Sequence, residues 1–264
     1  MNQLTVASLQ MEQKHKDVDT NVSRLKELVT DGDFDLLVLP EMWTTGFIVD
    51  VEGLSPDYLD AAFDKGVATM SQLASRHNAA IYGTLIEPRP SGKPANTGLF
   101  LTPDGVAAVY RKKHLFGYGG ESKLFEAGDE RVQVSYRGWQ IRLCTCYDLR
   151  FPTWLRQDPS LGLYDLLLCS ANWPKPRHIA WERLLRARAI ENQCYLAASN
   201  RCGVPHPKLT YPGYSFILDA EGDSLAESKE PEERLLTTTL SLDDLHEKRD
   251  KFPVLQDLDP FSLL

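Results

Sequence analysis

The sequence has no long apolar run. Its longest hydrophobic stretches, such as residues 36–40 and 166–171, fall far short of the roughly 20 residues that a helix needs to cross a bilayer. The N-terminal residues carry neither a basic leader nor a sustained apolar segment, so neither a signal peptide nor a transit peptide is indicated. We therefore expect a cytoplasmic protein that does not interact with membranes.

The sequence also lacks clusters of positive charge. Lysine and arginine number 29 against 37 aspartates and glutamates, for a net charge of −8, and no basic block is interleaved with aromatic residues. A nucleic-acid-binding protein needs such cations to neutralise phosphates. We therefore do not expect nucleic acid as a partner.

The cysteines do not form a disulfide framework. There are five, all in the second half of a large chain, whereas such frameworks belong to small secreted proteins and use cysteines in pairs. None has the paired spacing of a zinc site. The glycines at positions 117, 119 and 120 match neither a dinucleotide-binding fingerprint nor a P-loop. We expect reduced cysteines and no structural metal.

The composition is that of an ordinary globular protein. With 264 residues, of which 42% are hydrophobic and 25% charged, the chain can bury a large core, and we expect one domain over residues 1–264 with a C-terminal tail from about residue 241. Strand-like and helix-like patterns alternate, with both helix crossovers and hairpins between strands. This mixture favours an α/β fold with mixed sheets covered by helices, such as a four-layer α-β-β-α sandwich. Residues 213–218 and 235–240 are predicted to pair as a closing hairpin.

Three polar residues stand at places where chemistry can use them. Glu41 follows Pro40 at the end of a predicted strand, Cys146 ends the predicted strand 139–145, and Lys112 follows the predicted strand 106–110. A free thiol is only a few per cent ionised at neutral pH, so a nucleophilic cysteine needs a base or a cation nearby. Taken singly, each residue also has an ordinary interpretation as a solvated carboxylate, a surface lysine or an inert buried cysteine.

Several short segments together resemble the carbon–nitrogen hydrolase, or nitrilase, superfamily. In chain order they are LVLPE (37–41), YRK (110–112), HLF (114–116), GESK (120–123), CYDLRFP (146–152), SANW (170–173) and RARAIENQ (186–193). The similarity extends over about residues 4–240. It implies the four-layer α-β-β-α sandwich of the nitrilase type, a reaction without cofactor or metal, and assembly into a homodimer or a higher homo-oligomer.

The resemblance also implies roles for individual residues. Glu41 would be the general base, Cys146 the nucleophile, and Lys112 the cation that stabilises the tetrahedral species. Glu121 would orient Lys112 and the substrate amide, and the backbone N–H of Tyr147 would join Lys112 in the oxyanion hole.

Lys113 and Cys144, which stand close in sequence to these residues, are not expected to take part in catalysis. The family's lysine is separated from the HLF block by one residue, which selects Lys112 over Lys113, and its cysteine directly precedes Tyr-Asp, which selects Cys146 over Cys144. Asp148 and Arg150 are expected to hold the turn after the cysteine.

The segments 172–177 and 189–193 resemble the omega-amidase branch, which hydrolyses monoamides of small 2-oxo dicarboxylic acids such as 2-oxoglutaramate. A nitrilase, an N-carbamoyl amino acid amidohydrolase and a catalytically silent binding module remain alternatives. Asn172 and Trp173 are candidate substrate-binding residues. Because an anionic amide needs a local cation, Arg177 is our candidate for binding its distal carboxylate, with His178 as the alternative.

Overall fold

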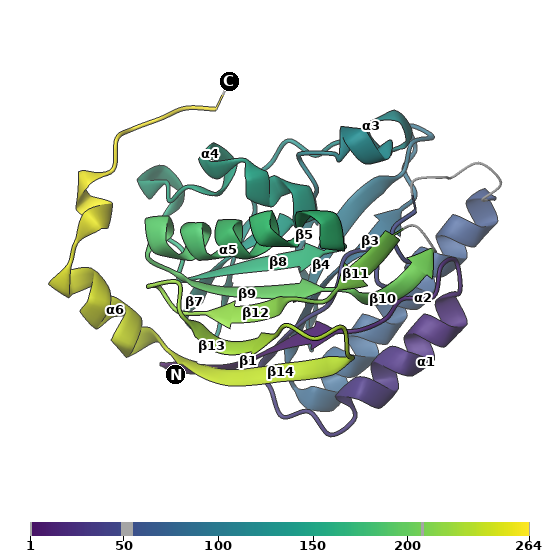
Figure 1. The fold of residues 1–264 in the computed structure, drawn as a ribbon, viewed down its shortest axis with the longest axis horizontal. Coiled ribbons are helices and arrows are strands. Elements are labelled where there is room, and N and C mark those ends of the chain that lie inside the picture. Colours follow the sequence, from purple (N-terminus) through teal and green to yellow (C-terminus); the bar gives the residue numbers. More distant parts are fainter. Residues whose placement is uncertain (1, 49–54, 207–208, 264) are drawn as a thin grey trace.

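Two six-stranded mixed β-sheets form the centre of the molecule (Figure 1). The computed structural model describes residues 2–48, 55–206 and 209–263. Across the first sheet the strands are β14 (Arg234–Ser241), β1 (Gln3–Gln10), β2 (Leu36–Val38), β3 (Ala80–Glu87), β4 (Ala95–Thr102) and β5 (Gly105–Arg111). Across the second they are β13 (Ser224–Ser228), β12 (Ser215–Leu218), β9 (Tyr195–Asn200), β8 (Leu166–Ala171), β7 (Trp139–Thr145) and β6 (Gln133–Tyr136).

The two sheets share one topology. In each, three central strands run parallel, and antiparallel strands flank them on both sides. The remaining elements are α1 (Val18–Val29), α2 (Pro56–His77), α3 (Glu121–Leu124), α4 (Pro152–Leu155), α5 (His178–Asn192), α6 (Leu242–Lys251) and the hairpin of β10 (Cys202–His206) with β11 (Leu209–Pro212). None of the described helices is both long and apolar enough to span a membrane.

Alternation of buried side chains along the strands produces the layers. In β1, Val6 faces the core between the sheets, whereas Ala7 and Leu9 face the core that α1 and α2 cover. Successive side chains of a strand point to opposite faces, so a sheet buried on both sides needs apolar residues at nearly every position. On the far side, α5 lies over the second sheet (Figure 1). The predicted α-β-β-α sandwich is confirmed.

The helix boundaries follow the expected signals. The side chain of Ser55 accepts a hydrogen bond from the backbone N–H of Tyr58, and Pro56 is the first residue of α2. This combination fixes a helix start, because the cap satisfies a free backbone donor and proline has none to lose. At the other end Asn78 adopts a left-handed conformation with φ of 49°.

One predicted pairing is wrong. Residues 213–218 and 235–240 do not form a hairpin, because β12 pairs with β13 and β9 in the second sheet, while β14 crosses to the first sheet and pairs along its whole length with β1. The strand β13 was missed between them. The hairpin of β10 and β11 was missed as well.

Side-chain hydroxyl groups join the two sheets through buried hydrogen bonds to backbone carbonyls. Within the described residues there are four such bonds, from donor to acceptor: Ser8 to Ala198 (2.8 Å), Ser199 to Leu9 (2.5 Å), Ser170 to Leu39 (2.6 Å) and Tyr82 to Cys144 (2.9 Å). Two of the acceptors stand two residues before Glu41 and Cys146. These bonds therefore fix the backbones that lead into both candidate catalytic residues.

We predict that Tyr82→Phe lowers the free energy of unfolding in urea by about 1–3 kcal/mol, because it removes the donor of a fully buried hydrogen bond between the sheets, to the carbonyl of Cys144. Tyr58→Phe is the matched control, since the Tyr58 hydroxyl is buried without a hydrogen-bond partner among the described residues. This control should change stability little. Equal losses in the two variants would contradict the role assigned to the Tyr82 bond.

Candidate active site

The candidate site lies where strand ends of both sheets meet. Glu41 follows β2, Lys112 follows β5, Cys146 follows β7 and Asn172 follows β8. The two sheets touch directly at this point, because the backbone N–H of Glu41 donates to the carbonyl of Ala171 over 3.4 Å. Residues far apart in the chain thereby reach one place.

Cys146 occupies an unusual backbone conformation. It has a φ of 46°, a left-handed value that side chains with a Cβ rarely adopt. Here the chain turns from β7 into a short 3-10 helix, Cys146–Arg150. The side chain is 8% exposed and lines a cavity. Tyr147 is the second residue of this helix, so its N–H is among the donors that a helix start leaves without an internal acceptor.

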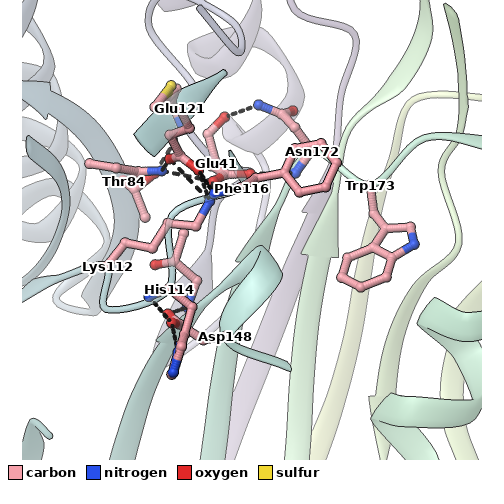
Figure 2. Close-up of polar contacts among 12 residues, drawn as sticks. Glu41, Thr84, Lys112, His114, Phe116, Glu121, Asp148, Asn172 and Trp173 are labelled. Carbon is pink, nitrogen blue, oxygen red and sulfur yellow. Dashed lines mark hydrogen bonds and ion pairs between the residues drawn. The ribbon is translucent and has the colours of Figure 1, made fainter. Parts of the chain in front are cut away.

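The carboxylate of Asp148 holds this turn together. It accepts hydrogen bonds from the backbone N–H of Thr145 (3.1 Å) and the hydroxyl of Tyr110 (2.6 Å). It also accepts from both the backbone N–H and the ring Nδ1 of His114 (2.9 Å each) (Figure 2). The sequence prediction for Asp148 is thus confirmed. The prediction for Arg150 is wrong, because its guanidinium lies 4.9 Å above the Trp173 ring and lines the cavity instead.

Glu41 is completely buried and every oxygen has a partner. Its Oε1 accepts from Lys112 Nζ (2.8 Å) and Asn96 Nδ2 (2.7 Å), and its Oε2 accepts from the backbone N–H of Asn172 (2.9 Å). The Asn172 side chain in turn donates to the carbonyl of Glu41 over 2.7 Å. These contacts fix the orientation of the carboxylate.

Lys112 lies between two carboxylates (Figure 2). Its Nζ is 2.8 Å from Glu41 Oε1, and 3.1 and 2.8 Å from the two oxygens of Glu121, with all three side chains buried. Glu121 stands at the start of α3, and its Oε2 also accepts from the backbone N–H of Phe116 over 2.6 Å. The loop predicted over residues 111–130 therefore contains a helix that carries one of the three charges.

Burial and charge set the protonation of these groups. Burial raises the pKa of Glu41, an effect that Lys112 opposes and Glu121 reinforces. Burial acts to lower the pKa of Lys112, but Glu121 and Glu41 outweigh it and hold this pKa well above its ordinary value. Burial also raises the pKa of the Cys146 thiol well above its ordinary value, and the charge of Glu41 adds to the rise. The resting site thus holds an ammonium and a neutral thiol.

A cavity of about 520 Å³ opens in front of Cys146. Its wall includes the three candidate substrate-binding residues, Asn172, Trp173 and Arg177, and the Arg177 guanidinium lies 5.0 Å from the Phe116 ring centroid. His178 lies outside this wall, beside a neighbouring hollow, and its Nδ1 contacts the carbonyl of Lys175. The structure therefore places His178 in a different hollow from the Cys146 thiol.

Three residues of the site were missed in the sequence. Asn96 in β4 contacts two of the carboxylates, while Arg201 and Tyr211 line the cavity with the guanidinium 4.6 Å above the ring. A polar residue inside an apolar strand pattern was the one available signal for Asn96. Within the described parts of the chain, no group of three or more metal-binding side chains could hold a metal ion.

Comparison with known proteins identifies the family. Residues 5–250 match the carbon–nitrogen hydrolase family, and the chain belongs to it. It is 41% identical over 229 residues to the omega-amidase YafV of Escherichia coli K12, covering 87% of this chain and 86% of that protein. It is 35% identical over 225 residues to the 2-oxoglutaramate amidase of Bacillus subtilis, covering 85% of each.

A solved structure agrees with this assignment. The carbon–nitrogen hydrolase superfamily protein XC1258 of Xanthomonas campestris, crystallised with an arsenic adduct in its active site, superposes with a TM-score of 0.91 at 38% identity over 100% of both chains. The family resemblance predicted from the sequence is confirmed.

The charge arrangement predicts a strong effect of removing the ammonium. Lys112→Met leaves Glu41 and Glu121 buried without a cation and should lower the free energy of unfolding at neutral pH by about 3–5 kcal/mol. Without Lys112, which opposes the rise, the folded-state pKa of Glu41 lies further above the unfolded value of about 4.3, so the native state binds more protons than the unfolded state. Stability relative to the wild type should therefore recover as pH falls, in unfolding curves measured over a pH series.

Lys113→Met is the control for this experiment. The Lys113 ammonium is partly exposed and lies 5.5 Å from the Trp154 ring centroid, a contact of about 0.5–1 kcal/mol. Its removal should cost little at any pH. A large, pH-dependent loss in Lys113→Met, or none in Lys112→Met, would refute the charge arrangement described.

Proposed function

We propose that this protein is an omega-amidase, a cysteine-dependent hydrolase that converts the terminal amide of a small carboxylic acid monoamide into acid and ammonia. The observation that carries the proposal is the Cys146 thiol, which lines a cavity directly beside the Glu41 and Lys112 pair. The similarity to omega-amidases and 2-oxoglutaramate amidases over most of the chain supports it. No cofactor takes part in the reaction proposed.

The first half of the reaction forms a thioester. Glu41 accepts the proton of Cys146, and the sulfur attacks the amide carbon. The oxygen of that carbonyl becomes an oxyanion, which the Lys112 ammonium and the backbone N–H of Tyr147 stabilise. As the C–N bond breaks, Glu41 returns its proton to the leaving nitrogen and ammonia departs.

The second half hydrolyses this intermediate. Glu41 takes a proton from water as the hydroxide attacks the thioester carbon, the C–S bond breaks, and the sulfur regains the proton. A base is required at the first step because the raised pKa of the Cys146 thiol leaves it neutral at rest, and at the second because neutral water is a weak nucleophile. Glu121 keeps the ammonium of Lys112 in place. Lys112 has three N–H donors, and in the resting site two point to Glu121 and one to Glu41. The donor to Glu41 turns to the oxyanion once Glu41 has taken the proton of Cys146.

The cavity suits an anionic substrate. Its wall carries Arg150, Arg177 and Arg201, each of which lies over an aromatic ring and, within the described residues, forms no ion pair with a carboxylate. A guanidinium keeps its charge at any relevant pH and binds a carboxylate through two parallel hydrogen bonds. An amide that also carries a carboxylate therefore finds a cation in the same cavity as the thiol. We also propose that the protein assembles into a homodimer or a higher homo-oligomer, as the family resemblance implies.

The proposal is tested by ammonia release from a panel of monoamides, nitriles and N-carbamoyl amino acids. We expect turnover of 2-oxoglutaramate and related monoamides, loss of at least about 10⁴-fold in kcat for Cys146→Ala, and nearly normal activity for Cys144→Ala. Cys144 is fully buried and stands opposite Cys169 of the neighbouring strand β8.

Each alternative predicts a different outcome in the same panel. Preference for nitriles or for N-carbamoyl amino acids would assign the protein to those activities. No turnover, together with no alkylation of Cys146 by iodoacetamide, would identify a silent binding module. Normal activity of Cys146→Ala with loss in Cys144→Ala would overturn the choice of nucleophile.

We further propose that Arg177 binds the distal carboxylate. Arg177→Ala should raise the KM for 2-oxoglutaramate by about tenfold or more, as expected for the loss of a charged hydrogen bond of about 1.5–3 kcal/mol, and leave the KM of small neutral amides nearly unchanged. Steady-state kinetics on both substrates checks this. Equal effects on charged and neutral amides, or none on either, would show that the charge is recognised elsewhere.

A further inference from the structure

Asn96 contacts all three charged residues of the site. Its Nδ2 is 2.7 Å from Glu41 Oε1 and 3.0 Å from Glu121 Oε1. Its backbone carbonyl accepts a hydrogen bond from the backbone N–H of Lys112 over 2.9 Å. The residue is fully buried, and its Oδ1 has no hydrogen-bond partner among the described residues. The amide group thus faces the carboxylates with its donors and leaves its own acceptor unsatisfied.

This orientation has an electrostatic consequence. An amide NH₂ group has two donors and no acceptor, so both of its contacts require oxygens that accept. Hydrogen bonds to a carboxylate favour its ionised form. Two carboxylates 2.8 Å from one ammonium carry a net charge of −1 in a buried place, which by itself favours binding of a proton by one of them.

The other charged and titratable groups that act on Glu41 do not replace these donors. Lys112 is shared with Glu121, which raises the pKa of Glu41, and Cys146 is the group that Glu41 must deprotonate. Tyr211, on β11, senses the charge of Glu41 but stays protonated because burial raises its pKa to about 12. Apart from Lys112, the side-chain donor to Oε1 of Glu41 is therefore Asn96.

We propose that Asn96 is a positioning residue, which holds the carboxylate of Glu41 ionised and oriented toward Cys146 by donating to both glutamates at once. The inference rests on the proposed function in that Glu41 is taken as the base. It makes the hydrogen-bond donors of residue 96, rather than its size, the property that the site requires.

Two variants separate these properties. Asn96→Ala removes the donors and leaves a small cavity. Asn96→Asp keeps the size and shape but replaces the donors by a third carboxyl group beside Glu41 and Glu121. If the donors matter, both variants should be impaired, and Asn96→Asp more strongly. If only packing matters, Asn96→Asp should resemble the wild type.

The measurement is the rate of Cys146 alkylation by iodoacetamide between pH 5 and 10, located by peptide mass spectrometry. This readout needs no amide substrate. We expect the apparent pKa of alkylation to rise by about one unit in Asn96→Ala, which is about tenfold slower labelling on the acid side, and further in Asn96→Asp. The acid limb of kcat/KM for amide hydrolysis should move in parallel.

Asn192 supplies the matched control, because it is also a fully buried asparagine and donates to the carbonyl of Arg188 over 2.9 Å, at the end of α5. Asn192→Ala should lose stability without moving the pH profile of alkylation.

An unshifted alkylation profile in both Asn96 variants, or a shift in Asn96→Ala that Asn96→Asp restores, would overturn the inference. If the wild type hydrolyses no amide while the Asn96 variants shift the alkylation profile as expected, the proposed function fails and the inference stands.

Discussion

A single buried ammonium between two buried carboxylates is the constraint on which the site depends. Charges removed from water are stable only when each has partners, and losing one partner leaves the others exposed to the full cost of burial. Lys112, Glu41 and Glu121 meet this condition together with donors from Asn96 and from backbone N–H groups. The arrangement places a base, a cation and a thiol together in a buried environment, where electrostatic interactions are stronger than in water.

The arrangement of the two sheets brings these three side chains together. Each sheet ends its central strands at the same edge, and hydroxyl groups that cross the interface fix the backbones just before Glu41 and Cys146. Beyond those bonds the chain departs from regular structure. Met42 and Cys146 both have positive φ values, 45° and 46°, so each sheet contributes one strained turn to the site. The regular strands set where Glu41 and Cys146 lie, and the irregular turns set the direction in which their side chains point.

Much of this could be predicted from the sequence, and the limits are physical. Pro40 ends the apolar strand before Glu41, and Ser55 with Pro56 starts a helix, because these signals act locally. The pairing of β14 with β1 could not be predicted, since alternation reveals a strand but not its neighbour. The contacts of Asn96 could not be predicted for the same reason, because its partners Glu41 and Glu121 lie in the segment after β2 and in α3. The positions of Arg201 and Tyr211 depend on the β10 and β11 hairpin, whose sequence has no clear alternation.

The pairing of β14 with β1 ties together the two ends of the fold. Eight residue pairs, from Gln3 with Ser241 to Gln10 with Arg234, join segments more than 220 positions apart. During synthesis β1 leaves the ribosome long before its outer neighbour exists, and until then one edge of the first sheet has unpaired backbone N–H and C=O groups. A nascent chain of this protein therefore has a long interval in which another strand can pair with β1. Once β14 has been synthesised and has paired with β1, the sheet is complete and this edge is no longer available to another strand.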